Sequence, residues 1–195
     1  MKELAKSGDP LAKKAFKREL ALRFSSGHET VVNYLVKEGY LNHFTKDELM
    51  SLIPDLECVL LKGKPMLVIG GVLTLSEKGI KDLSEIKGLY KLKLLKSSYL
   101  DINQIQSLPE SIGHIQSLKI LSLYRNQLKT LPQFIGKFQS LKELNLGNNQ
   151  LKSLLESILT LAALNELCLD KSVKIKKEQL TQLKKKGVRI VYIWF

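Results

Sequence analysis

The chain has 195 residues, of which 44% are hydrophobic and 26% are charged, and its formal net charge is +12 at pH 7. This composition is typical of a folded globular chain and argues against a collagen-like or strongly disordered one. Two cysteines are too few for a disulfide framework, and no apolar run is long enough to cross a bilayer. The first residues lack the apolar run of a signal peptide, so we expect a cytoplasmic protein.

Residues 1–54 are predicted to form a helical N-terminal cap of three short helices. Asp9 followed by Pro10 is a favourable start for the first helix. Thr45 and Glu48 have the spacing of a capping box, which predicts the start of the third helix. We expect these helices to pack against the first repeat of the segment that follows.

Residues 55–71 are predicted to form a β-hairpin that leads into the repeats. Two apolar runs flank the sequence Lys62-Gly63-Lys64-Pro65, which is typical of a turn. The Gly63-Lys64 pair lacks the upstream glycine and the following Ser or Thr of a phosphate-binding loop, so we exclude that reading.

Residues 72–175 are organised around a sequence repeat. Residues 108–130 read LPESIGHIQSLKILSLYRNQLKT, and residues 131–153 repeat the unit as LPQFIGKFQSLKELNLGNNQLKS. A fixed period of this length with LxxLxLxxNxL inside it indicates a solenoid of stacked units. In the same phase we predict an irregular unit at 73–84 and further full units at 85–107 and 154–176.

This unit, LPxxIGxLxxLxxLxLxxNxLxx, is similar to the 23-residue leucine-rich repeats common in bacterial proteins. It also resembles the repeats of the plant intracellular Ras-group proteins. The resemblance covers residues 72–175 and is strongest over 108–153. It implies a horseshoe-shaped binding scaffold, usually for protein partners, without catalysis of its own.

Each unit is predicted to contribute one short strand, of which Leu121-Ser122-Leu123 is the clearest example. Strand side chains alternate between faces, so the two leucines point into a core that only stacked units can close. The predicted fold is an α/β leucine-rich repeat solenoid with a parallel sheet on its concave face. An asparagine side chain can satisfy backbone groups of the bend that no strand reaches. We therefore predict an internal asparagine ladder of Asn103, Asn126 and Asn149.

Residues 176–195 are predicted to form a C-terminal cap that consists of a helix and a strand. Leu180 and Leu183 are the apolar positions of the helix, and the strand runs from Val188 to the aromatic pair Trp194 and Phe195. The last repeat of a solenoid needs a cover for its core, so we interpret the two aromatic residues as cap packing.

The sequence offers no recognisable catalytic or metal-binding group. The three histidines, His28, His43 and His114, do not stand at metal-ligand spacing with one another, with cysteine or with a carboxylate. Cys168 is expected on the outer face of a strand, without a histidine nearby to activate it. No nucleophile elbow or dinucleotide fingerprint occurs. We therefore expect no enzymatic activity, no metal and no cofactor.

The outward side chains of the predicted strands form a candidate partner-binding surface on the concave face. Tyr99 and Tyr124 are of a residue type that is enriched among interface anchors. Each of the four full repeats has three outward positions in or beside its strand. These twelve positions hold four acids and no Lys or Arg, which favours a protein or peptide partner carrying Lys or Arg. We expect the chain itself to be a monomer. The candidate contact residues are Tyr99, Asp101, Ile120, Ser122, Tyr124, Arg125, Glu143, Asn145, Glu166 and Asp170.

The net charge leaves one alternative open, namely electrostatic binding to nucleic acid or to an anionic membrane surface through basic flanks. Lysines recur before the predicted strands and after the asparagine bends, where they are most simply a solvated face. The predicted concave acids would repel a phosphate backbone, so nucleic acid is the less favoured partner. The recurring lysines are Lys96, Lys119, Lys142, Lys129 and Lys152.

Overall fold

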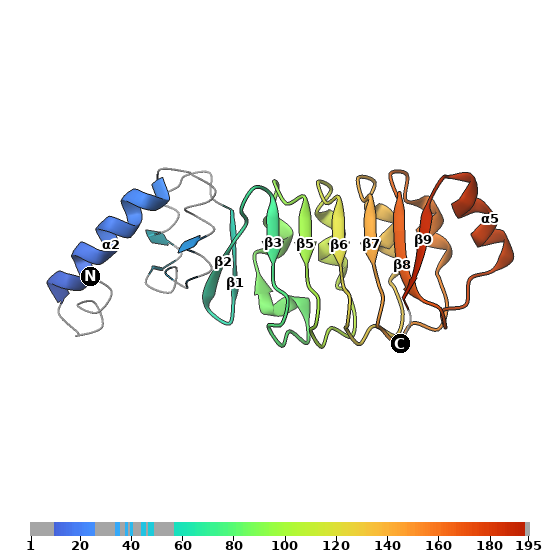
Figure 1. Ribbon diagram of the computed structural model, residues 1–195, viewed down its shortest axis with the longest axis horizontal. Helices are drawn as coiled ribbons and strands as arrows, with labels where there is room; N and C mark the ends of the chain where they lie inside the picture. Colours follow the sequence, from blue (N-terminus) through green and yellow to red (C-terminus); the bar gives the residue numbers. More distant parts are fainter. Residues whose placement is uncertain are drawn as a thin grey trace. The chain divides into compact units, whose positions relative to one another are not determined.

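A computed structural model describes residues 10–25, 34–35, 38, 40, 44–45, 47–48 and 57–193 (Figure 1). The chain divides into two compact units, residues 1–70 and 71–195. The predicted helix start at Asp9, most of the second and third N-terminal helices, His28, His43, Trp194 and Phe195 lie outside the described residues. None of the described helices has the length and apolar character that a membrane-spanning segment requires.

The first unit contains helix α2, Pro10–Ser25, which buries Phe16 and Leu20. The predicted capping box is present, because the Thr45 backbone N–H donates to the Glu48 carboxylate at 2.8 Å and the Glu48 N–H donates to the Thr45 hydroxyl at 3.2 Å. The Lys17 ammonium lies 2.8 Å from the Glu48 carboxylate. This bond, with that from Thr45, holds the pKa of Glu48 below its usual value.

The predicted hairpin is formed by β1, Cys58–Leu61, and β2, Lys64–Leu67, which pair antiparallel. Lys62 and Gly63 join them with φ values of 50° and 77°. Two successive positive φ values define the turn type whose twist matches that of the flanking strands.

The second unit is built on a six-stranded parallel sheet whose strands follow one another in chain order, apart from the two-residue strand β4, Ile86–Lys87 (Figure 1). From β5 onward each residue pairs with the residue 23 positions later, whereas β3 and β5 are offset by 25. The predicted repeat solenoid is therefore confirmed. The strands are β3 Val72–Thr74, β5 Ser97–Tyr99, β6 Ile120–Ser122, β7 Glu143–Asn145, β8 Glu166–Asp170 and β9 Arg189–Ile193.

Short helical arms return the chain from one strand to the next. A 23-residue unit that spends its residues on a strand and two bends leaves room for little more than one helical turn, so the full repeats use 3₁₀ helices. Only the last arm is an α-helix. The arms are η2 Leu83–Glu85, η3 Leu89–Lys91, η4 Glu110–His114, η5 Gln133–Lys137, η6 Glu156–Thr160 and α5 Lys177–Lys185.

The core of the second unit lies between the sheet and these arms. Leu121, Leu144 and Leu167 pair across β6, β7 and β8, and each is at most 1% exposed. Ile135 and Phe138 of the arm side are fully buried. Each unit covers its neighbour's apolar side chains, which is why the fold requires stacking.

The predicted asparagines bond the bends of successive repeats to one another. The Asn126 amide nitrogen donates to the carbonyls of Leu123 in its own repeat and Leu100 in the repeat before, at 3.0 and 2.9 Å. Its amide oxygen accepts the Ile105 N–H at 3.0 Å. Asn103 and Asn149 make the same pattern of bonds one repeat to either side.

The residue before each asparagine has a positive φ, and at Ile102 this conformation is strained. Its φ is 54°, and the equivalent Arg125 and Asn148 have 54° and 58°. A β-branched side chain tolerates this region poorly, whereas asparagine tolerates it well. Ile102 is also 42% exposed, so its side chain contributes little to the core.

We therefore expect Ile102→Asn to stabilise the protein by about 1 kcal/mol, seen as a rise of roughly 2 to 4 °C in Tm. Ile102→Val keeps the branched carbon and should give no gain. Thermal unfolding of both variants measures the effect, and equal melting of Ile102→Asn and the wild type would show that the bend is not strained.

The C-terminal segment differs from the expected cap in one respect. Strand β9 pairs in parallel with β8 at the same 23-residue offset, with Arg189 opposite Glu166 and Ile193 opposite Asp170. The segment therefore continues the repeat ladder, with α5 in place of a 3₁₀ arm. This addition carries a basic residue and two apolar residues onto the outer side of the sheet.

Candidate functional site

The predicted concave face corresponds to the side of the six-stranded sheet that is turned away from the arms, called the sheet face below. Side chains that point to this face form three columns across the strands. The first column is Val72, Ser97, Ile120, Glu143, Glu166 and Arg189. The second is Thr74, Tyr99, Ser122, Asn145, Cys168 and Val191. The third is Asp101, Tyr124, Gly147, Asp170 and Ile193.

A shallow depression of about 130 Å³ lies between the first two columns. It is bordered by the half-buried ring of Tyr99 and by Ile120, whose side chain is also partly exposed. Seven outward residues thus meet at one place: six of them are predicted contact residues, and the seventh is Cys168. They are Tyr99, Ile120, Ser122, Glu143, Asn145, Glu166 and Cys168.

Two of the four predicted contact acids instead hold the bends of neighbouring repeats. The Asp101 carboxylate accepts the Tyr124 backbone N–H at 3.0 Å and also the Ser122 hydroxyl. The Asp170 carboxylate accepts the backbone N–H groups of Asn148 and Asn149 at 2.7 and 3.1 Å, and Asp170 is only 5% exposed. We therefore leave both aspartates out of the contact surface.

The third acid, Glu166, forms an ion pair with Arg189 of β9. Sequence analysis did not place Arg189 on this surface, because β9 was expected to be a cap and not a further rung of the ladder. Glu143 is the remaining acid, and it is exposed and forms no ion pair with a described residue. A hydrogen bond from a backbone N–H does not cancel the charge of a carboxylate, so the expectation of a basic partner stays a prediction.

Strand β9 covers the third column at Gly147. A Cβ atom built on Gly147 would lie 2.1 Å from Cδ1 of Ile193 and 3.4 Å from Cδ2 of Tyr124. Ile193 thus occupies the space beside Gly147, and a larger residue there would push it away. The open part of the sheet face is consequently centred on β5, β6 and β7.

Cys168 is half-buried on the sheet face, and we expect it to react slowly with iodoacetamide. Burial, followed by the hydrogen bond and the charge of Glu166, raises the pKa of the Cys168 thiol from 9.0 to about 11. The thiolate is the reactive form, so alkylation at pH 8 should be about 100-fold slower than for an unperturbed thiol. Glu166→Gln removes the negative charge and should accelerate the reaction. Mass spectrometry over time measures both rates, and fast alkylation of the wild type would contradict this prediction.

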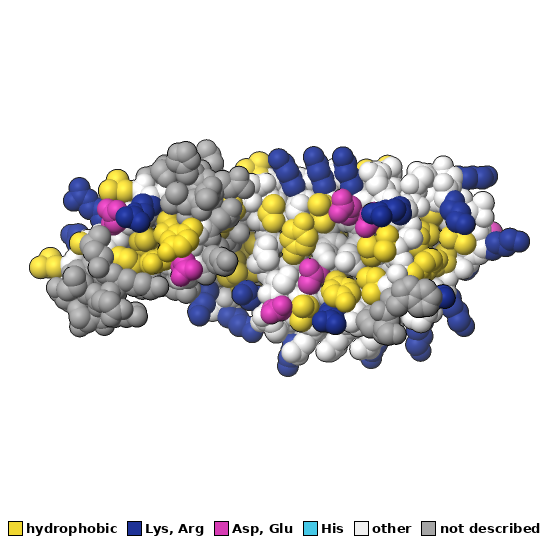
Figure 2. Space-filling view, viewed as in Figure 1, with side chains coloured by type: hydrophobic (Ala, Val, Ile, Leu, Met, Phe, Trp, Pro, Cys, Tyr) yellow, Lys and Arg dark blue, Asp and Glu magenta, His cyan; other side chains and the backbone are white. Residues whose placement is uncertain are grey.

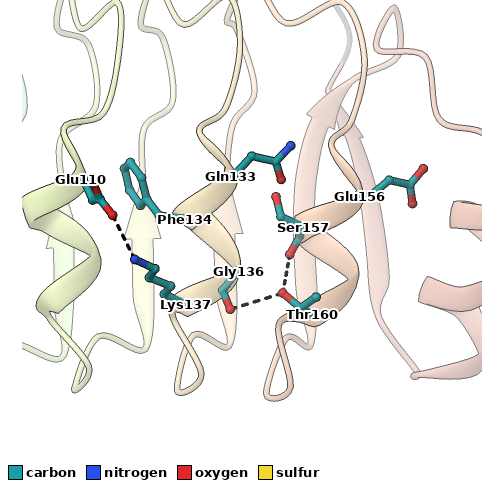
Figure 3. A pocket seen from close by; sticks show the side chains of 8 residues that line it. All are labelled: Glu110, Gln133, Phe134, Gly136, Lys137, Glu156, Ser157 and Thr160. Carbon is teal, nitrogen blue, oxygen red and sulfur yellow. Dashed lines mark hydrogen bonds and ion pairs between the residues drawn. The ribbon is translucent and has the colours of Figure 1, made fainter.

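On the arm side, η4, η5 and η6 border a wider and more open depression of about 750 Å³ (Figure 3). Its polar groups bond mainly to one another: the Lys137 ammonium lies 3.0 Å from the Glu110 carboxylate, and the Thr160 hydroxyl donates to the Ser157 carbonyl at 2.8 Å. His114 on η4 is exposed. In the described part of the chain, no group of three or more His, Cys, Asp or Glu side chains could hold a metal ion.

Comparison with known proteins agrees with this geometry. The sequence profile of the leucine-rich repeat region matches residues 67–193. The chain is similar to a solved leucine-rich repeat protein from Leptospira interrogans, with 36% identity over 52% of this chain and 26% of that chain, and a TM-score of 0.46. It is also similar to an internalin, inlF, from Listeria monocytogenes, with 21% identity over 60% of this chain and 33% of that chain, and a TM-score of 0.51.

The chain thus spans only 26% and 33% of the length of these two solved chains. Among curated proteins, none matches the sequence. The profile match covers well over half of the chain, and its residues include all six strands of the parallel sheet, the 23-residue register from β5 to β9 and the asparagine ladder. The chain therefore belongs to the leucine-rich repeat family.

Proposed function

We propose that this chain is a non-catalytic scaffold that binds a protein or peptide partner on the sheet face. Leucine-rich repeat proteins are in general binding scaffolds, which supports the class of function. The observation that carries the location is a pair of partly exposed rings on the sheet face: Tyr99, which borders the depression, and Tyr124, which follows β6 in the next repeat. The contact surface in this proposal is Tyr99, Ile120, Tyr124, Glu143 and Asn145.

Both rings are well suited to anchor a partner. Tyr99 ends β5 and Tyr124 follows β6 by two residues, and the carbonyls of both accept backbone N–H groups of the preceding repeat, so their backbone is already fixed before binding. Tyrosine offers apolar area and a hydroxyl, with few rotatable bonds to immobilise. The guanidinium carbon of Arg125 lies 5.5 Å from the Tyr124 ring centre, which further restrains that ring. Little conformational freedom is therefore lost when a partner covers these side chains.

The test first identifies a partner by crosslinking in native lysate followed by mass spectrometry, and then measures its binding to variants. We expect Tyr99→Ala combined with Tyr124→Ala to increase the dissociation rate at least about tenfold, because truncated anchors act mainly on dissociation. The association rate and Tm should change little, since both rings lie outside the core.

Tyr90→Ala is the matched control, because Tyr90 is 52% exposed but lies on η3 and not on the sheet face. Its effect on binding should be negligible. If the double variant Tyr99→Ala with Tyr124→Ala bound the identified partner as tightly as the wild type, the contact would lie elsewhere. The proposal of binding on the sheet face would then be wrong.

A further inference from the structure

We propose that the partner segment bound on the sheet face is acidic and extended, and that it lies along a row of three lysines. This inference rests on the proposed function and reverses the partner charge expected from the sequence. The row consists of Lys96, Lys119 and Lys142, called the lysine margin below.

The lysine margin is fixed by the backbone ladder of the repeats. The Lys119 N–H donates to the Lys96 carbonyl, and the Lys142 N–H donates to the Lys119 carbonyl, both at 2.7 Å. Neighbouring strands are about 4.8 Å apart, so three lysine stems leave the sheet side by side. Each lysine directly precedes a first-column residue, and all three are exposed. Figure 2 shows a row of Lys and Arg side chains at the upper margin of the strands, and further ones along the lower margin and at the right-hand end.

No acid of the second unit neutralises this row. None of the three ammonium groups forms an ion pair with a described residue. Three cations on adjacent strands repel one another, and a bound carboxylate relieves that repulsion while it gains attraction from more than one of them. The margin is thus more favourable for an anionic ligand than three isolated surface lysines would be.

Three of the four acids in the columns beside the margin bond within the protein. Asp101 and Asp170 are bonded to backbone N–H groups, and Glu166 is paired with Arg189. Glu143 is then the only exposed acid without a described ion-pair partner in the three columns. Acidic side chains of a partner are attracted to the margin itself, where the three ammonium groups raise their association rate, and not to the acids of the columns.

The neighbouring side chains favour a peptide among the anionic ligands. Ile120 follows Lys119 directly, and Tyr99 borders the same depression, so apolar contacts lie within one strand spacing of the ammonium groups. An extended peptide alternates its side chains, and can therefore direct acids to the margin and apolar groups to the depression. A nucleic-acid backbone or a lipid surface would use the lysines but would leave the depression and the rings without a matching group.

The experiment selects peptides from a random twelve-residue phage library on the intact chain, and then measures the affinity of the enriched peptides with a fluorescent label. We expect enrichment of Asp and Glu together with apolar residues. Replacing the three lysines by glutamine, Lys96→Gln with Lys119→Gln and Lys142→Gln, should weaken binding at least about tenfold at low salt. Salt should weaken wild-type binding and have a smaller effect on this variant.

The matched control replaces three other exposed lysines by glutamine, Lys129→Gln with Lys152→Gln and Lys174→Gln, which removes the same net charge away from the margin. It should retain nearly full affinity. Equal loss in both triple variants would show a non-specific charge effect and would overturn the inference. Enrichment of neutral or basic peptides, or of none, would also overturn it.

The double variant without the two tyrosine rings distinguishes failure of this inference from failure of the proposed function. If Tyr99→Ala with Tyr124→Ala weakens the selected peptides but the lysine variant does not, the sheet face binds peptides and the inference on charge is wrong. If neither variant matters, both proposals fail. Phosphatidylserine vesicles and a single-stranded oligonucleotide are tested in parallel. If the vesicles or the oligonucleotide bind in a way that requires the three lysines, and the acidic peptides cannot displace them, the margin is a site for that ligand. The proposal of an acidic peptide would then be wrong.

Discussion

Replacing Leu144 by aspartate should destabilise the protein by about 5 kcal/mol or more, which is comparable with the total stability of many domains. Leu144 is 1% exposed in β7, where it pairs with Leu121 and Leu167 of the adjoining strands. The variant loses the buried leucine and places a carboxylate among apolar side chains without a partner. Because each repeat is stabilised by its neighbours, damage at the central strand weakens the contacts on both of its sides.

Urea unfolding monitored by circular dichroism measures this effect. Asn145→Asp is a closely matched control, because it introduces the same residue one position away on the sheet face. The Asn145 side-chain oxygen accepts the Gly147 N–H at 3.1 Å, and aspartate can keep that bond. We expect the control to unfold near the wild-type midpoint. Similar unfolding of Leu144→Asp and Asn145→Asp would contradict the assignment of core and outward positions.

The repeat architecture could be predicted from the sequence because two periodicities agree. The 23-residue period places equivalent residues in register, and the two-residue alternation of strands decides which of them are buried. Leu121 and Leu123 therefore identify the core side without any further information. The asparagine column follows from the same phase, because a buried bend needs donors and an acceptor at one fixed position.

The charges of the sheet face could not be predicted in this way. The Asp101 carboxylate accepts a hydrogen bond from the Tyr124 backbone N–H of the following repeat. The Asp170 carboxylate accepts hydrogen bonds from the Asn148 and Asn149 N–H groups of the preceding repeat. The two aspartates occupy equivalent positions and still bond in opposite directions. Such bonds depend on the local shape of each bend, and the repeat pattern does not encode that shape. Position alone therefore suggested four available acids where the structure leaves one.

The strand from Val188 was predicted as part of the cap, but its register with β8 could not be predicted, for a related reason. Ile190 and Tyr192 stand where the preceding repeat has Leu167 and Leu169, so the leucine pattern has disappeared although the register continues. The arm before it has become the α-helix α5, which has a different apolar spacing. The 23-residue distance from Glu166 to Arg189 was the remaining signal, and it becomes meaningful only once the two strands are known to pair.

The asparagine ladder carries the second large effect that we expect. Asn126→Ala should destabilise the protein by roughly 2 to 4 kcal/mol, because it leaves the buried Ile105 N–H without its partner, which costs about 1 to 3 kcal/mol, and removes one bond from each of two buried carbonyls. These carbonyls, of Leu100 and Leu123, keep the bonds that Asn103 and Asn149 donate. Chemical denaturation of purified variants measures the free energy of unfolding.

The neighbouring positions indicate whether the hydrogen bonds, and not the loss of side-chain volume, cause the effect. Asn126→Asp keeps the size and the acceptor for Ile105 but loses both donors and directs a charge at two carbonyls, so it should be at least as damaging as alanine. Gln127→Ala removes a larger side chain from the adjacent half-buried position and should cost little. Asn149→Ala should fall between them, because Asn149 makes the same three bonds at a less buried bend. We expect the order Asp and Ala at 126, then Ala at 149, then Ala at 127 from lost hydrogen bonds weighted by burial, and a stable Asn126→Asp variant would exclude that explanation.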